Sequence, residues 1–344
     1  MKLIVTIPAL NEEATIGDVI REVPRTIEGV DRIEVLVLDD GSTDGTVAAA
    51  LAAGADYVVS NSRNRGLAFT FQRALEEALA RGADVIVNTD ADNHYDQTRI
   101  PELIQPILEG RAEIVVGSRL LRGLKMKPAN KHGNRLANFI LQRLLRIDGI
   151  DVSSGYRAYS RRAALGLNVF SGHTYTHETL FSALDQGLKI VSVPLPARAV
   201  ERPSRLISSL PRHVWRAGTV VLQSILRYRP FQAYGALGLA LVVLGLVPFT
   251  RYMYLFATGE AAGHVQSLIA GAALVLFGAQ VFAMGLLATA VGWNRRLLEE
   301  VLLRLKEEQL SRHAEADSGA AATATLAPVV PLAARGREEK RKVA

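Results

Sequence analysis

Two long apolar segments in the C-terminal half restrict the architecture of this 344-residue chain more than any other feature. Residues 232–256 and 266–291 are each long enough to cross a hydrocarbon core of roughly 30 Å as a helix. The linker between them, residues 257–265, is short, so we expect a two-helix transmembrane hairpin. Arg251 and Pro248 interrupt the first segment, and we expect the Arg251 side chain to extend toward the far interface.

Basic residues flank this pair of segments and predict its orientation. Arg227 and Arg229 precede the first segment, and Arg295 and Arg296 follow the second, whereas the linker contains no Lys or Arg. By the positive-inside bias, both ends lie in the cytoplasm. The first ten residues read as a core strand and not as a cleavable signal. The sequence therefore predicts an integral protein of the cytoplasmic membrane, with its N-terminal region and C-terminus cytoplasmic.

The segments on either side of the hairpin carry charge in different ways. Residues 202–229 contain six arginines and no carboxylate, and residues 206–228 combine arginines with apolar side chains, as in a helix that lies on a lipid surface. The alternative is a helix packed against the N-terminal domain. Nucleic acid is not expected as a partner, because no nucleic-acid module surrounds these arginines. After the hairpin, residues 293–315 predict a charged helix that could pair subunits as a homo-oligomer, and residues 316–344 predict a disordered basic tail.

Residues 1–200 have the pattern of an α/β domain, followed by a juxtamembrane segment at residues 201–230 and the membrane pair at residues 231–292. Short β-branched apolar segments alternate with helical ones, and they occupy residues 2–7, 32–38, 57–60, 84–89 and 113–117. Such alternation predicts a mostly parallel sheet with helices on both faces. Ligands bind such sheets beyond the carboxyl ends of the strands, which brings together the loops at residues 8–13, 39–46 and 90–96.

Asp90 and Asp92 follow the strand predicted at residues 84–89, in the stretch VNTDADNHYDQ. Residues two apart at the end of a strand project to the same side, so both carboxylates can meet at the edge of the sheet. A divalent cation that holds a diphosphate needs one or two carboxylates, with phosphate oxygens completing its shell. Two solvated loop acids are the alternative for this pair taken alone. The chain has no cysteine, which excludes thiolate metal sites, disulfides and cysteine nucleophiles.

Acids also follow the two other strands. Asp39 and Asp40 come after the second strand, where an acid can accept hydrogen bonds from a base or ribose, and Ser42 or Thr43 can cap the next helix. After the first strand, Asn11 is expected to cap a helix that carries Glu12 and Glu13. An ordinary helix cap explains part of each pattern. Three acid-bearing strand ends on one edge nevertheless favour a site for a nucleotide and a metal ion.

The residues resemble the family 2 glycosyltransferases of the GT-A (Rossmann-like) fold, and within them the polyprenyl-phosphate glycosyltransferases similar to dolichol-phosphate mannose synthase. The resemblance covers residues 2–229, and paired C-terminal spans are also found in several members. Residues 8–12, 39–46 and 90–92 are similar to the opening, nucleotide and metal motifs of that family. Further matches are VGSR ending at Arg119, SSGYRAYSR around Arg157, TYTHETL around Glu178, and RPSRL with Arg202, Ser204 and Arg205.

The resemblance implies roles for individual residues. Nucleotide binding is implied for Pro8, Leu10, Asn11, Glu12, Asp39, Asp40, Gly66 and Asp90. Mg²⁺ or Mn²⁺ is implied on Asp90 and Asp92, with Asp92, Arg119 and Arg202 as catalytic residues. Contact with the acceptor phosphate is implied for Arg119, Arg135, Arg157, Arg202, Ser204 and Arg205, and guanidinium groups suit that task. Relatives carry glutamine where this chain has His94, which remains a candidate together with Glu178.

The implied reaction is transfer of a sugar, with inversion, from a UDP- or GDP-sugar to a polyprenyl phosphate such as undecaprenyl or dolichyl phosphate. A lipid phosphate arrives largely ionised, since its second pKa is about 6, and therefore needs no general base. The alternatives are a family 2 enzyme that glycosylates a hydroxyl group of a glycolipid or polysaccharide, which would need such a base, and an inactive membrane protein that binds sugar nucleotides.

Overall fold

The fold comes from a computed structural model that describes residues 1–119, 150–169, 175–195, 198, 226, 230–260 and 262–326, with side chains described as far as residue 312. Two compact units are distinguished, Met1–Val301 and Leu302–Ala344. The arginine-rich segment predicted to form a surface helix, residues 206–228, lies outside the described residues except for Leu226, which is helical. Arg135, Arg202, Ser204 and Arg205 also lie outside them.

A seven-stranded sheet organises the N-terminal domain, in the order β3-β2-β1-β4-β6-β5-β7. The strands are β1 (Lys2–Ala9), β2 (Arg32–Asp39), β3 (Tyr57–Ser60), β4 (Val85–Asn88), β5 (Ile114–Ser118), β6 (Arg157–Ser160) and β7 (Ile190–Pro194). β6 runs antiparallel to β4 and β5, and the other strand pairs of the described sheet are parallel, which confirms the predicted mostly parallel sheet. β6 and β7 were not predicted, because β6 begins with an arginine and β7 is only partly buried.

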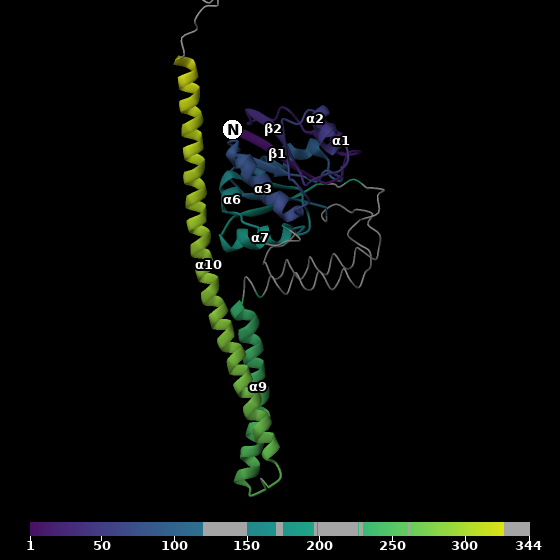
Figure 1. The fold of residues 1–344 in the computed structure, drawn as a ribbon. Coiled ribbons are helices and arrows are strands. Elements are labelled where there is room, and N and C mark those ends of the chain that lie inside the picture. The colour runs from purple at the N-terminus through teal and green to yellow at the C-terminus, as the bar shows by residue number, and fades with distance from the viewer. Residues whose placement is uncertain are drawn as a thin grey trace, which may run out of the picture. The chain divides into compact units, whose positions relative to one another are not determined.

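Helices cover both faces of this sheet, as predicted (Figure 1). Alternate β1 residues Leu3, Val5 and Ile7 pack in one core with α1 (Ile16–Glu22) and α4 (Ile100–Leu108). On the opposite face, α3 (Leu67–Ala80) contacts β1, β2 and α6 (Arg161–Gly166). The other helices among the described residues of the domain are α2 (Thr46–Ala52), η1 (Gln97–Arg99) and α7 (Thr176–Asp185). Strands buried on both faces need apolar side chains at successive positions, which explains the short apolar runs in the sequence.

Two described helices, α9 (Pro230–Ala257) and α10 (Val265–Leu326), are long and apolar enough to cross a membrane. They run side by side (Figure 1) and are in close contact at glycines of both helices. A Cβ atom added to Gly238 would lie 2.7 Å from the carbonyl oxygen of Gly278. α10 continues without a break through residues 293–315 and ends at Leu326, so the prediction of disorder is wrong for residues 316–326.

The close approach at Gly238 gives a testable prediction. Gly238→Ala should destabilise the helix pair by about 1–3 kcal/mol, because the new methyl group meets backbone atoms that cannot rotate away. Gly292→Ala is the matched control, since a Cβ there has no heavy atom within 4 Å. The measurement is SDS-induced unfolding of the purified protein in mild detergent. Equal stability of the two variants would contradict this packing.

Candidate active site at the carboxyl edge of the sheet

The loops that carry the predicted site follow β1, β2 and β4, which are neighbours in the sheet. β1 pairs in parallel with β2 as far as Ala9 and Asp39, and with β4 as far as Thr6 and Asn88. The carboxyl ends of these strands therefore meet at one edge. The structure brings together residues 8–13, 39–46 and 90–96 there, as the sequence predicts.

Hydrogen bonds join the first two of these loops. The Asn11 N–H donates to Ser42 Oγ at 2.9 Å, and Asn11 Oδ1 accepts from the Thr43 N–H at 2.9 Å. The Glu12 N–H donates to Thr46 Oγ1 at 2.9 Å. The prediction that Asn11 caps α1 is therefore wrong, since that helix begins at Ile16 and Asn11 is used between loops. The prediction that Ser42 or Thr43 caps the next helix is also wrong. The N-cap of α2 is Gly45, and Ser42 and Thr43 instead contact Asn11.

Asp40 and Asp39 have different environments although they are adjacent. Asp40 is 4% exposed and its carboxylate accepts from Asn61 Nδ2 at 2.8 Å, from the Arg65 N–H at 2.9 Å and from the Gly66 N–H at 2.9 Å. Asp40 thus fixes the backbone of Arg65 and Gly66, directly before α3. Asp39 accepts one bond, from the Ser42 N–H to Oδ1 at 2.9 Å, and among the described residues its Oδ2 has no partner. Asp39 is therefore the better candidate to accept a hydrogen bond from a nucleotide.

A pocket opens beside these residues at the end of β1. Its lining consists of Pro8, Ala9, Leu10, Asp40, Asn64, Gly66, Leu67 and Thr70. Four of the residues predicted to bind the nucleotide, Pro8, Leu10, Asp40 and Gly66, therefore share one cavity. The lining is mainly apolar, with a few polar groups, as expected of a site for a flat base. The sequence did not identify Asn64 or Thr70, because neither lies in a recognisable motif.

Asp90 is the first residue of the third loop, residues 90–96. Within the described ranges no hydrogen-bond donor contacts its carboxylate. Gly155 approaches closely, since a Cβ there would lie 3.0 Å from Asp90 Oδ1 and 2.9 Å from the Tyr175 hydroxyl. Burial, with a smaller contribution from the charge of Asp92, raises the pKa of Asp90 to about 7. A partly buried carboxylate that has no donor among the described residues and a second carboxylate nearby fits a divalent cation.

The described residues contain no group of three or more His, Asp or Glu side chains that could hold a metal by themselves. Asp90 and Asp92 would thus supply two oxygen ligands and leave the others to a bound diphosphate or water. That division suits Mg²⁺ or Mn²⁺, which bind through one or two carboxylates together with phosphate oxygens. The pair therefore fits the predicted divalent cation.

The raised pKa of Asp90 predicts how metal binding depends on pH. Only the ionised carboxylate ligates a cation, so Mn²⁺ affinity should rise as the pH increases through about 7 and become constant above it. The folded-state pKa lies above the ordinary value of 3.8, so this group lowers the stability of the metal-free protein as the pH rises between these values. Asp90→Asn should remove that loss. Mn²⁺ titrations at a series of pH values measure the affinity, and an affinity that does not change with pH would contradict the first prediction. Thermal unfolding of the metal-free protein and of Asp90→Asn at the same pH values measures the effect on stability.

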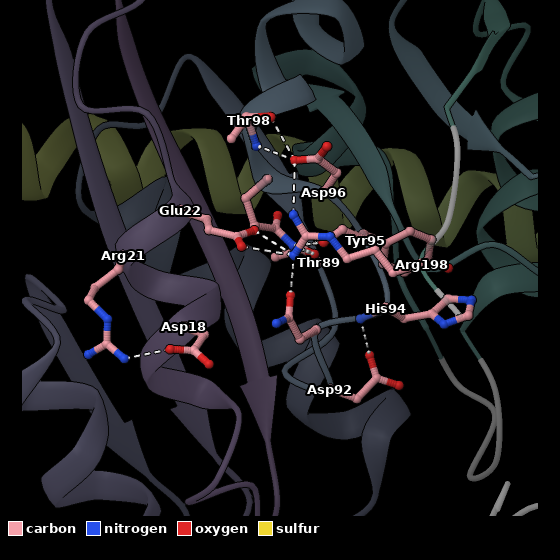
Figure 2. Close-up of polar contacts among 12 residues, drawn as sticks. Asp18, Arg21, Glu22, Thr89, Asp92, His94, Tyr95, Asp96, Thr98 and Arg198 are labelled. Carbon is pink, nitrogen blue, oxygen red and sulfur yellow. Dashed lines mark hydrogen bonds and ion pairs between the residues drawn. The ribbon is translucent and has the colours of Figure 1, made fainter. Parts of the chain in front are cut away.

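His94 follows the metal motif, two residues after Asp92. Its backbone N–H donates to Asp92 Oδ1 at 3.1 Å, and its ring lies edge-on to Tyr95 with centroids 5.3 Å apart (Figure 2). Burial lowers the pKa of His94, so the imidazole is neutral at neutral pH. The structure thus assigns the backbone of His94 to the Asp92 carboxylate. A role for its ring as a ligand remains a prediction.

Arg119 lies at the end of β5 and is held by two residues that the sequence did not identify. Its Nε donates to Asp151 Oδ2 at 2.8 Å, and its Nη2 donates to Ser153 Oγ at 2.8 Å. Asp151 is 1% exposed and holds Ser153 in turn, through a bond of 2.7 Å from Ser153 Oγ. Among the described residues Nη1 of Arg119 has no acceptor. Arg119 is therefore fixed in orientation and keeps donors for a phosphate group.

Arg157 occupies a different environment from the one predicted. Its side chain is fully buried, and its donors bond to the carbonyl oxygens of Val152, Ser154 and Thr176 and to Thr179 Oγ1, all within 2.9 Å. This geometry argues against the prediction that Arg157 contacts the acceptor phosphate. Instead, Arg157 ties the segment that carries Asp151 and Gly155 to the start of α7.

Replacement of Arg157 tests this structural role. Arg157→Met keeps the length of the side chain but leaves three carbonyl oxygens without a donor, so it should destabilise the fold by at least about 3 kcal/mol. Arg161→Met is the matched control, because Arg161 donates to one carbonyl, that of Ala83, in a partly buried position. Denaturant unfolding measures both variants. Normal stability together with weaker acceptor binding in Arg157→Met would restore the phosphate-binding role.

The last predicted candidate, Glu178, lies in α7 and is 6% exposed. Its neighbour His177 is partly buried, and this burial lowers the pKa of His177 to about 4. Thr176, one residue earlier, accepts from Arg157. α7 therefore supports the segment around Arg157, and a direct role for Glu178 stays a prediction.

Comparisons with known proteins agree with this site. The model of the family described as "Glycosyl transferase family 2" matches residues 4–166. Glycosyltransferase AglJ of Haloferax volcanii is 29% identical over 89% of this chain and 95% of its own length. The dolichyl-phosphate hexose transferase of the same organism is 31% identical over 57% of this chain and 82% of its own length.

Among solved structures, glucosyl-3-phosphoglycerate synthase from Mycobacterium tuberculosis, in complex with Mn²⁺, UDP and glucosyl-3-phosphoglycerate, has a TM-score of 0.52. It is 29% identical, and the match covers 65% of this chain and 78% of that one. That neighbour holds Mn²⁺ together with a nucleoside diphosphate, as we expect at Asp90 and Asp92. With the sheet, the acid-bearing loops and these relatives in agreement, the chain belongs to glycosyltransferase family 2.

Proposed function

We propose that this enzyme transfers a hexosyl group from a nucleoside-diphosphate sugar to a polyprenyl phosphate in the membrane. The observation that carries the proposal is that Asp90, Asp92 and Arg119 follow strands that end at one edge of the sheet. A pocket suited to a nucleotide base opens at the same edge. Relatives that match over most of their own length include the dolichyl-phosphate hexose transferase of Haloferax volcanii. The two apolar helices supply a membrane anchor for an enzyme with a lipid acceptor.

In the proposed reaction an oxygen of the acceptor phosphate attacks the anomeric carbon of the donor sugar. A new bond between this carbon and the phosphate oxygen forms as the bond to the nucleoside diphosphate breaks, which inverts the anomeric centre. No proton needs removal, since the acceptor phosphate is largely ionised at neutral pH. When bound, a divalent cation stabilises negative charge on the departing diphosphate. Arg119, fixed by Asp151, contributes donors that need no reorganisation during the reaction.

The residues expected to meet the acceptor are Arg119 together with Arg135, Arg202, Ser204 and Arg205. A lipid phosphate lies at the plane of the headgroups, and residues 202–229 carry the positive charge suited to that plane. With both ends of the hairpin in the cytoplasm, the catalytic domain would use a cytoplasmic nucleotide sugar. Topology can be measured by labelling single cysteines introduced into the cysteine-free chain at Gly259 and Ala344.

A donor panel tests the proposal. Purified protein is incubated with UDP- and GDP-sugars, Mn²⁺ and a short-chain polyprenyl phosphate, and products are identified by mass. We expect one sugar added per lipid phosphate, in a product that mild acid cleaves, and no product with the matched polyprenol that lacks phosphate. Transfer to the polyprenol or to a sugar hydroxyl, with none to the lipid phosphate, would contradict the proposal.

A hydroxyl acceptor is the second candidate, and one observation favours keeping it. The mycobacterial neighbour was solved with glucosyl-3-phosphoglycerate, whose name describes a glucosylated small acid. Phosphoglyceric acid therefore belongs in the acceptor panel. A hydroxyl acceptor needs a general base near the attacking oxygen. An acid-stable product would identify this reaction.

A further inference from the structure

Arg198 lies behind the metal-bearing loop and belongs to none of the predicted sets of site residues. Its Nη1 lies 2.8 Å from both carboxylate oxygens of Glu22 and 2.7 Å from Asn93 Oδ1 (Figure 2). Its Nη2 lies 3.4 Å from Asp96 Oδ1, and its backbone N–H donates to the carbonyl oxygen of His94 at 2.8 Å. One arginine thus contacts Asn93, His94 and Asp96.

These contacts matter because the loop has an unusual backbone at its centre. Asn93 has a φ of 57°, in the left-handed region that few residues other than glycine and asparagine adopt readily. That bend lets the His94 N–H donate to Asp92 Oδ1 at 3.1 Å. The loop ends at Asp96, whose Oδ1 accepts from the Thr98 N–H and caps η1. The direction of the Asp92 carboxylate therefore depends on how residues 93–96 are held.

Glu22, the partner of Arg198 on the other side, belongs to a helix that is packed in the core. Glu22 ends α1, and the buried residues Val19 and Ile20 of this helix pack in the same core as Tyr95 and Ile100. Arg198 thus connects a packed helix to the loop that follows Asp92. A guanidinium can contact three side chains at once because its donors point in several directions in one plane, which a lysine ammonium cannot reproduce.

We propose that Arg198 is a positioning residue that clamps residues 93–96 against α1, so that Asp92 is held ready for the cation. The inference rests on the proposed function, since it assigns Asp92 to the metal. Each ion pair of Arg198 is partly exposed and contributes little stability by itself. The effect is therefore expected in metal affinity, where partners behind the ligands typically change binding by about 10–100-fold.

The test compares Mn²⁺ binding by four variants, measured as free Mn²⁺ by electron paramagnetic resonance with UDP and with GDP present. Arg198→Ala should weaken Mn²⁺ binding by about tenfold. Arg198→Lys should fall between this variant and wild type, and Glu22→Gln should show a smaller loss than Arg198→Ala. Arg21→Ala is the matched control on the same helix, because it removes an exposed ion pair with Asp18, 2.6 Å long, that does not touch the loop. It should bind Mn²⁺ like wild type.

A second readout separates positioning from a general loss of structure. Binding of the nucleotide without metal depends on the pocket beside β1, so it should be unchanged in Arg198→Ala, while the increase in nucleotide affinity caused by Mn²⁺ is lost. If folded Arg198→Ala binds Mn²⁺ as tightly as wild type, the role of Arg198 is overturned, while the proposed function is unaffected. Equal losses with and without metal would also overturn it. If Arg198→Ala does not fold, Arg198→Lys and Glu22→Gln give the same comparison. Failure of the wild-type protein to bind Mn²⁺ with either nucleotide would refute the metal site of the proposed function itself.

Discussion

Asp92→Asn is expected to reduce sugar transfer by at least about 10³-fold, because it removes one of two carboxylates for the cation while leaving the loop intact. Asparagine has nearly the same size as aspartate, and its Oδ1 can still accept from the His94 N–H. The loss should therefore appear in activity and Mn²⁺ binding without a change in thermal stability. Rates of product formation with saturating donor and acceptor measure the first effect.

The control for this variant is Asp18→Asn, which removes an exposed carboxylate of α1 that pairs with Arg21 and belongs to none of the predicted site residues. It should leave transfer unchanged. A second comparison uses wild-type protein with the metal removed by a chelator, which should lose as much activity as Asp92→Asn. Full activity of Asp92→Asn in the presence of chelator would exclude a metal at this position.

Arg119→Ala is expected to lower kcat by about 10²–10³-fold, the effect typical of losing a fixed donor to charge that develops in the transition state. The variant should also destabilise the fold, since Asp151 is 1% exposed and would be left as a buried charge without its partner. Activity and stability would then fall together. The two causes need to be separated before the lost activity is assigned to phosphate binding.

A double variant separates them. Arg119→Ala with Asp151→Asn removes the buried charge along with its partner, so it should recover most of the lost stability without recovering activity. Asp151→Asn alone keeps Arg119 but loses the charge that holds it, and should show an intermediate kcat. Denaturant unfolding and steady-state rates are measured on all three. Recovery of activity in the double variant would contradict a direct role for Arg119.

The expected strands were close to those observed because each is a short apolar run that a buried parallel sheet requires. The run at residues 57–60 coincides with β3, whereas β1 extends two residues beyond the run expected at residues 2–7 and ends at Ala9. β6 was not predicted because its four residues, Arg157–Ser160, begin with a charged arginine and therefore do not form an apolar segment. Its guanidinium is satisfied by the carbonyl oxygens of Val152 and Ser154, just before it in the chain, and of Thr176 in α7, and an apolar pattern predicts none of these bonds.

The sequence by itself determined the parallel α/β domain, the two apolar helices and the loops that carry Asp39 and Asp90, because strand periodicity, hydrophobic length and acids at strand ends are local properties of the chain. The tertiary structure alone decided which distant residues surround the site: Asp151 beside Arg119, Gly155 against Asp90, and Arg198 against the loop that follows Asp92. The physical reason is that a hydrogen bond or a close contact depends on distances of a few ångströms between residues far apart in the chain. Those distances are set only when the helices and strands pack together.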